Sequence, residues 1–224
     1  MDIYYLVFIL PAVIITLWAQ IKVKTTFNKY SKIYSQNGIT AYDAVRKILD
    51  ANGLSNVVIE HISGSLTDHY DPKERVIRLS DSVYSSMSVA SIGVAAHEAG
   101  HAIQHAKSYA PLALRNTVYP VVNISSQAAI PLIFIGFLIN SLNLVYLGII
   151  LFSAVVLFQL ITLPVEFNAS GRALKILKDY NILSANELGG AKRVLSAAAM
   201  TYVASALVAA AHLLRFVLMA RRRN

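Results

Sequence analysis

Runs of about twenty apolar residues constrain this chain more than any other feature of its sequence. Three clear runs cover residues 3–21, 119–139 and 142–163, and a weaker one covers residues 196–219. A helix of about 20 apolar residues spans the hydrocarbon core of a bilayer. The composition, 56% hydrophobic and 14% charged, is also too apolar for an ordinary soluble domain. We therefore predict an α-helical membrane protein with three to four spans.

The apolar runs differ in what surrounds them. No basic segment precedes the first run and no small-residue cleavage site follows it, so we interpret it as a retained anchor and not as a signal peptide. Only Asn140 and Ser141 separate the second run from the third, which predicts a transmembrane helical hairpin. The last run is rich in alanine and contains His212 and Arg215, and the sequence leaves open whether it spans the membrane.

The polar region between the first two spans has the pattern of a small α+β unit. The sequence predicts a helix over residues 40–52 and strands over 56–62, 66–70 and 75–79, the last two joined as a hairpin. Five regions result: an anchor, the α+β region, the transmembrane hairpin, a polar helical segment, and an apolar helix with a basic tail. Their predicted ranges are 1–21, 22–117, 118–163, 164–195 and 196–224.

The distribution of basic residues predicts the topology. Eleven Lys and Arg residues fall within 22–117 and five within 164–195, whereas the turn at 140–141 has none. Positively charged loops stay in the cytoplasm, so both polar regions are predicted there and the turn outside. Arg221, Arg222 and Arg223 disagree with this rule if the last run spans. The basic residues behind the net charge of +8 are expected to contact anionic lipid of the bilayer, and no nucleic-acid partner is predicted.

A metal-binding pattern lies in the α+β region. His97-Glu98-Ala99-Gly100-His101 reads H-E-x-x-H, within an apolar run that Ser88 could cap as a helix. Residues four apart share one face of a helix, so His97 and His101 can hold one ion while Glu98 reaches a water beside it. The chain has no cysteine, so a metal site would need histidine and carboxylate ligands. The pattern predicts a hydrolytic zinc site with Glu98 as general base.

A catalytic zinc normally takes a third protein ligand, for which Glu166 is the best candidate. It stands at the end of the third span, where a carboxylate needs a partner. We expect a helix to start there, with Ala169, Ser170 and Ala173 on a face that a second helix could approach closely. The alternative, a glutamate that favours a helix N-terminus, remains open at this point.

Three segments carry a family resemblance: LTDHYDP at 66–72, AAHEAGHAIQ at 95–104 and LPVEFNASGRA at 163–173. In these segments and over nearly its whole length, the chain resembles the YugP-like neutral zinc metallopeptidases, a bacterial membrane family. The resemblance implies a zinc-dependent peptidase of the bacterial plasma membrane. It also implies that His97, His101 and Glu166 bind Zn²⁺ and that Glu98 is the base.

The chain is more loosely similar to the HtpX-like and CAAX prenyl proteases, which place Glu-x-x-Ala-Asp after their spans. Here Ser170 stands where that aspartate would orient a histidine, so a hydroxyl would make the hydrogen bond without a charge. This difference argues against a strict analogy with the prenyl proteases.

Other residues receive secondary roles. His105 continues the His97 and His101 face, and we expect an outer or surface role for it. His69 could bind the oxyanion or be a turn residue, and Arg172 could pair with a carboxylate or with substrate. The strand 75–79 alternates basic and apolar residues, and we interpret it as an edge strand that pairs with extended substrate.

The sequence as a whole favours a membrane zinc endopeptidase acting at the cytoplasmic face on peptides or membrane proteins. The first rival is an intramembrane site-2-type protease, which would need the motif inside a span and an aspartate ligand in a later one. A metal transporter is a second rival, but residues 119–163 contain no His, Asp or Glu. A non-catalytic protein with a structural zinc would need a fourth ligand, for which His69 and His105 are the candidates.

Overall fold

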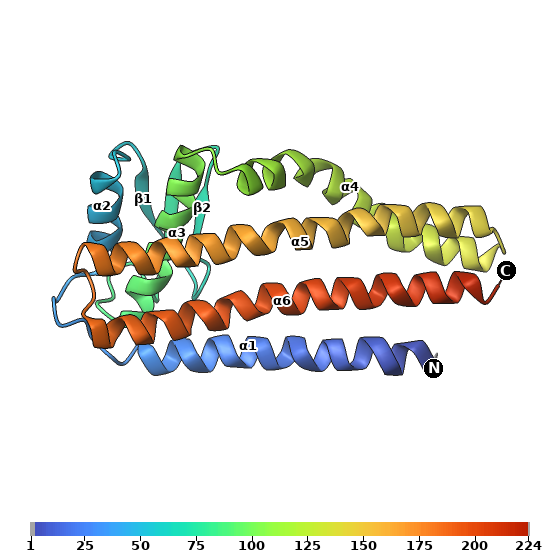
Figure 1. Cartoon of the computed structure of the whole chain (residues 1–224), viewed down its shortest axis with the longest axis horizontal. Coiled ribbons are helices and arrows are strands. Elements are labelled where there is room, and N and C mark those ends of the chain that lie inside the picture. Colours follow the sequence, from blue (N-terminus) through green and yellow to red (C-terminus); the bar gives the residue numbers. More distant parts are fainter. Residues whose placement is uncertain (1–2, 224) are drawn as a thin grey trace. The chain divides into compact units, whose positions relative to one another are not determined.

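The structure, a computed structural model, describes residues 3–223, most of which are helical (Figure 1). Four helical stretches are long and apolar enough to cross a membrane, by length and composition: Tyr5–Tyr30, Ala110–Leu138, Leu142–Asp179 and Ala185–Arg221. The first consists of a π-helical turn, η1 (Tyr5–Ile9), followed by α1 (Leu10–Tyr30), and the others are α4, α5 and α6. They confirm the predicted helical membrane protein, and they include the weaker C-terminal run.

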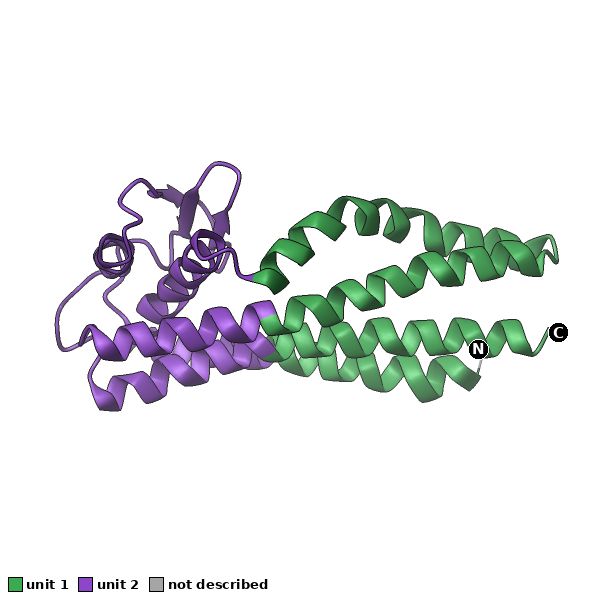
Figure 2. Cartoon of the chain, turned by 45° about the horizontal axis from the view of Figure 1, so that its top comes forward, with its two compact units in different colours: residues 1–20, 110–164, 200–224 green, residues 21–109, 165–199 purple. Residues whose placement is uncertain are grey.

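The chain divides into two compact units, coloured separately in Figure 2. Unit 1 comprises residues 1–20, 110–164 and 200–224, and contains most of the apolar helical length. Within it α4 and α5 pack closely as a hairpin, because a Cβ built on Gly148 would lie 2.8 Å from the Ala129 carbonyl oxygen. Asn140 turns the chain between them with a left-handed φ of 55°. Small residues at such contacts are typical of packed membrane helices.

Unit 2 comprises residues 21–109 and 165–199 and has its own hydrophobic core. It contains α2 (Ala41–Ala51), α3 (Val89–Ala106) and a three-stranded sheet of β1 (Val58–Ile62), β2 (His69–Asp71) and β3 (Val76–Ser80). The Thr40 hydroxyl caps α2 by accepting from the Asp43 amide. The core between helices and sheet includes fully buried Ile48, Leu49, Ile77, Leu79, Ile92 and Ile103.

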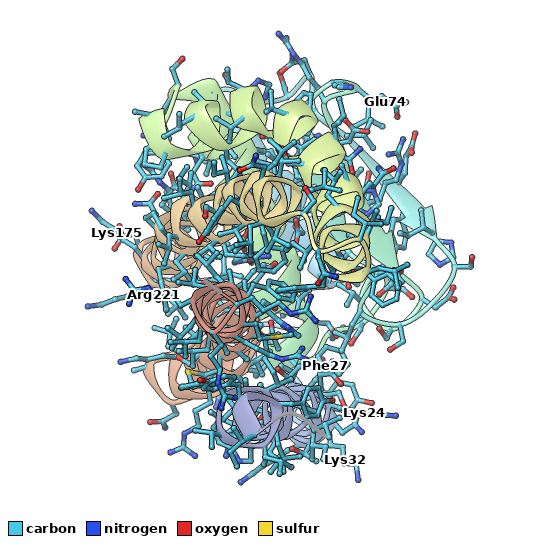
Figure 3. The ribbon with its side chains drawn as sticks, turned by 90° about the vertical axis from the view of Figure 1, so that its right-hand side faces the viewer. Lys24, Phe27, Lys32, Glu74, Lys175 and Arg221 are labelled. Atoms are coloured by element: carbon cyan, nitrogen blue, oxygen red, sulfur yellow. The ribbon has the colours of Figure 1, made fainter. Side chains whose placement is uncertain are left out.

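The sheet has the strand order β1-β3-β2, with β2 and β3 antiparallel and β1 parallel to β3. The predicted hairpin is therefore present, but the prediction that 75–79 forms an edge strand is wrong, because β3 is the central strand. Of its five residues, all but Arg78 are buried. Arg78 is partly exposed and forms ion pairs with Glu60 and Glu74. Glu74 extends outward from the hairpin turn in Figure 3.

Helix α5 continues without interruption past Pro164, so the expectation that a new helix starts at Glu166 is also wrong. The proline removes one backbone donor, which normally weakens a helix. Four residues at intervals of four compensate by being fully buried along one face of α5: Val165, Ala169, Ala173 and Leu177. Burial of this stripe keeps the segment helical and directs the same side of α5 toward the core of unit 2.

Candidate metal centre and active site

Helix α3 carries the H-E-x-x-H pattern and is fixed at its start by the predicted cap. The Ser88 hydroxyl accepts from the Ser91 amide and satisfies one of the first free N–H groups of the helix. No proline interrupts the 18 residues that follow. One turn of this regular helix brings the Nε2 atoms of His97 and His101 to within 3.1 Å of each other.

Helix α5 brings Glu166 to these histidines. Its Oε2 lies 3.3 Å from His97 Nε2 and 3.5 Å from His101 Nε2, and the residue is only 4% exposed. The two helices can come this close because Gly100 has no side chain. A Cβ at that position would lie 2.7 Å from the Ala169 carbonyl oxygen. All of these residues belong to unit 2.

The three atoms form a nearly equilateral triangle with sides of 3.1, 3.3 and 3.5 Å. Zinc bonds of about 2.0–2.1 Å in a tetrahedron separate neighbouring ligand atoms by about 3.3–3.4 Å. One carboxylate and two imidazoles are also the donor types that suit zinc. The ligand atoms of His97, His101 and Glu166 all lie within 4.8 Å of one another. These three residues therefore form a group that fits a zinc ion.

The other ring nitrogen of His101 meets a fully buried amide. Gln104 donates through Nε2 to the Val165 carbonyl at 2.8 Å and to Asn168 Oδ1 at 3.0 Å, which fixes the orientation of its amide. Its Oε1 is therefore the atom that faces His101 Nδ1 at 3.0 Å, and it must accept a hydrogen bond. The ring hydrogen sits on Nδ1, so the lone pair of Nε2 is free for a metal.

Ser170 has the equivalent position for the first histidine. Its hydroxyl lies 3.1 Å from His97 Nδ1. A hydroxyl can accept the Nδ1 hydrogen and hold the ring, and it brings no charge. Both histidines are thus oriented by neutral partners on or beside α5.

Glu98 is buried, with 8% of its surface exposed, and lies beside the histidine pair. Burial by itself lowers the pKa of His101, but hydrogen bonding to Glu166 and the negative charge of Glu98 raise it. Burial raises the pKa of Asp68, two hydrogen bonds from Ser80 oppose the rise, and the charge of Glu98 adds to it. Glu98 is therefore within electrostatic reach of both His101 and the residue before β2.

The secondary candidates lie apart from the metal-ligand group. His69 is exposed on β2, with its Nδ1 2.9 Å from the Thr67 carbonyl. His105 Nδ1 lies 2.8 Å from the Tyr70 hydroxyl. Arg172 donates to Asn168 Oδ1 at 2.6 Å and stacks over the Tyr109 ring. It thereby extends the hydrogen-bonded chain that runs through Asn168 and Gln104 to His101.

Sequence reasoning did not single out Gln104, Asn168 or Gly100. For Gln104 a signal existed, because it lies three residues after His101 and so shares its side of the helix. The role of Gly100 could not be read in the same way, because it depends on the close approach of a helix distant in sequence.

A membrane chain that directs two imidazoles and a carboxylate at one point has the build of a membrane zinc metallopeptidase. Comparison with known families agrees. Residues 5–221 match the profile of the family described as "Putative neutral zinc metallopeptidase", and the chain belongs to this family. It is 56% identical over 205 residues, 91% of each chain, to the Bacillus subtilis (strain 168) protein named "Putative membrane protease YugP". No solved structure matches the chain.

Proposed function

We propose that this protein is a membrane-bound zinc endopeptidase that hydrolyses peptide bonds with a water molecule as nucleophile. The observation that carries the proposal is the 3.1–3.5 Å triangle of His97, His101 and Glu166. Glu98 lies next to it on the same helical turn. Two ligands, a base and a third ligand are the parts that metal-assisted hydrolysis requires.

The residues divide the work as follows. His97, His101 and Glu166 would hold zinc, which supplies a Lewis acid that lowers the pKa of water and polarises a carbonyl. Glu98 takes the proton of the attacking water and delivers it to the leaving amine. Gln104 and Ser170 keep the imidazole rings in the tautomer and orientation that ligation needs.

The number of ligands supports catalysis over a structural role. A structural zinc has four protein ligands, whereas a catalytic zinc keeps one position open. Within residues 3–223 the ligand group has three members, and neither His69 nor His105 is one of them. A position for water therefore remains at a site built this way.

The position of the motif supports cleavage at the membrane surface over cleavage inside the bilayer. Helix α3 is not among the four membrane-length helices found in residues 3–223. We propose that the site lies at the cytoplasmic face of the bacterial plasma membrane, because Lys and Arg are concentrated in residues 22–117 and 164–195. Peptides and membrane-protein segments near that surface are the proposed substrates.

Strand β2 replaces residues 75–79 as the proposed partner of the substrate backbone. It is an edge strand of the sheet, it contacts α3, and Asp68 just before it is within electrostatic reach of Glu98. An extended peptide could add to this edge by main-chain hydrogen bonds.

The test combines zinc content with cleavage of an unfolded protein substrate by purified wild type, Glu98→Gln and Glu166→Ala. Wild type should carry about one zinc per chain. Glu98→Gln should keep the metal and lose about 10²–10⁴-fold in cleavage rate. Glu166→Ala should lose both metal and activity.

Glu60→Gln is the matched control, because Glu60 is an exposed glutamate on β1 in the same unit. It should behave like wild type in both measurements. Wild-type cleavage by Glu98→Gln would reject the mechanism, and full zinc retention by Glu166→Ala would reject the third ligand.

A further inference from the structure

A second feature of unit 2 lies beyond the metal centre, one turn further along α3. A cavity of about 230 Å³ opens between the end of α3, strand β2 and the segment before β1. Its apolar lining comes from Ala102, Ala106, Leu54 and Val57. Its polar lining includes Tyr70, His105 and Arg75, which can all donate hydrogen bonds.

The cavity lies along the side of α3 that carries the proposed base. Glu98 and His105 are seven residues apart, so they share a stripe of the helix about 10 Å long. Strand β2 lies against α3, and the Tyr70 hydroxyl is 2.8 Å from His105 Nδ1 on this stripe. Figure 1 shows β2 beside α3. A peptide extended along β2 from Glu98 would reach the cavity within about three residues.

Arg75 brings a positive charge to the cavity at a cost in backbone energy. Its φ of 56° is left-handed, a conformation in the hairpin turn that normally favours glycine. Within residues 3–223 its guanidinium has no ion-pair or hydrogen-bond partner, unlike Arg78, which pairs with three carboxylates. A strained backbone that holds an unpaired charge at a cavity indicates a role for the side chain.

Tyr70 and His105 form a hydrogen-bonded pair at the cavity. Burial raises the pKa of the Tyr70 phenol, and its hydroxyl lies within hydrogen-bond distance, 2.8 Å, of His105 Nδ1. A phenol and an imidazole can each donate a hydrogen bond to an anionic ligand. The cavity thus combines one permanent positive charge with two side chains that can donate hydrogen bonds.

We propose that this cavity is a substrate subsite that binds a carboxylate of the peptide, with Arg75 and His105 as its specificity-determining residues. The proposal rests on the proposed peptidase function, because it takes the ligand to be a peptide extended past Glu98. The carboxylate could come from an acidic side chain or from the C-terminus of a short peptide. Both present the same two oxygens to a guanidinium and an imidazole N–H.

The experiment measures equilibrium binding to zinc-loaded Glu98→Gln protein, so that it does not depend on cleavage. The probes are dansyl-labelled, amidated nine-residue peptides of Ala, Ser and Gly with one Glu at each position in turn. Each has a twin with Gln in place of Glu, and a third set has a free C-terminal carboxylate. At one position the Glu peptide should bind about tenfold more tightly than its Gln twin.

Three further substitutions in the Glu98→Gln background locate the effect. Arg75→Gln and Arg75→Gly should both reduce the preference to about one. Arg75→Gly should also unfold at an equal or higher temperature, because glycine adopts the left-handed backbone without strain. Lys73→Gln is the matched control, since Lys73 is an exposed cation on the same turn, and it should keep the preference.

Equal binding of Glu and Gln peptides at every position, or a preference that survives both Arg75 substitutions, would overturn the subsite. A preference limited to the free C-terminal set would assign it to the peptide terminus. The wild-type enzyme separates the two proposals. Cleavage without a carboxylate preference rejects the subsite alone, whereas preferential binding by a protein that cleaves no peptide rejects the peptidase function alone.

Discussion

The amide of Gln104 connects three parts of the site through three hydrogen bonds. It accepts from His101 and donates both to the Val165 carbonyl and to the Asn168 side chain. A buried amide with both ends engaged has one stable orientation, so it selects one tautomer of the histidine. At the residue scale, the orientation of His101 therefore depends on Gln104, which is not itself a proposed metal ligand.

Replacing Gln104 with methionine tests this role. Methionine has a similar size but cannot accept from His101 or donate to Val165, so the ring loses its fixed orientation. Zinc affinity, measured by competition with a chelator, should fall by about 10–100-fold. Exposed Gln36 provides the matched Gln→Met control, which should leave the affinity unchanged. Equal affinities in the two variants would contradict the positioning role.

At the element scale, the site depends on how closely α3 and α5 approach. Gly100→Ala would place a Cβ 2.7 Å from the Ala169 carbonyl oxygen, so the helices must separate. The variant should lose about 1–3 kcal/mol of stability and much of its zinc affinity, as Glu166 moves away from the histidines. Thermal unfolding and chelator competition measure the two effects.

Gly171→Ala is the control for that substitution, because no atom lies within 4 Å of the position that its Cβ would take. This alanine replaces glycine in a helix interior without a clash, so it should stabilise the protein by up to about 1 kcal/mol. If both alanines had the same effect, helix propensity and not the close approach would explain the result.

The hairpin turn between β2 and β3 gives a prediction about pH. Asp71 accepts from the amides of Glu74 and Lys73, which hold its pKa below the ordinary value of 3.8. A lowered pKa means that the carboxylate stabilises the fold above the unfolded-state value and loses this effect as pH falls through the folded-state value. Asp71→Ala should therefore lower the unfolding temperature by about 2 °C at pH 7 and by less at pH 3. An equal loss at both values would contradict this account.

The sequence predicted the elements that depend on local pattern better than those that depend on packing between distant segments. The Ser88 cap, the H-E-x-x-H turn and the four apolar helices follow from local pattern, and the structure has them. The continuation of α5 through Pro164 and the central position of β3 depend on packing between distant segments. Pattern alone therefore placed a break at the proline and an edge at residues 75–79, and both were wrong. The prediction that Glu166 meets the histidines depended, in addition to local pattern, on placing residues 22–117 and 164–195 on the same side of the membrane.

At the scale of the whole molecule, we predict which parts of the chain face the cytoplasm and which face the outside. The side chains of Lys24, Lys32 and Lys175 extend outward from unit 2 (Figure 3), and such exposed cations are expected to face the cytoplasm. The chain has no cysteine, so a single introduced cysteine reports its own location. In intact cells, a membrane-impermeant maleimide should label Ser141→Cys at the α4–α5 turn but not Lys47→Cys on α2.

Permeabilised cells should label both variants, which controls for the reactivity of each cysteine. Labelling of Lys47→Cys in intact cells would place the proposed active site on the outer face. Asn224→Cys extends the same experiment to the C-terminus, where three arginines follow the apolar length of α6. Labelling in intact cells is expected if α6 spans, as its length and composition indicate.

Gln104 and Ser170, the neutral partners of the two histidines, should make the proposed metal site sensitive to the supply of zinc. A carboxylate hydrogen-bonded to a zinc-ligating imidazole raises its basicity and tightens metal binding, and Gln104 and Ser170 do so less than an aspartate would. The ion would be a stronger Lewis acid but would exchange more readily with the cell's zinc buffer. We therefore expect the activity of this protein to follow the availability of free zinc and to decline early when cells are starved of the metal.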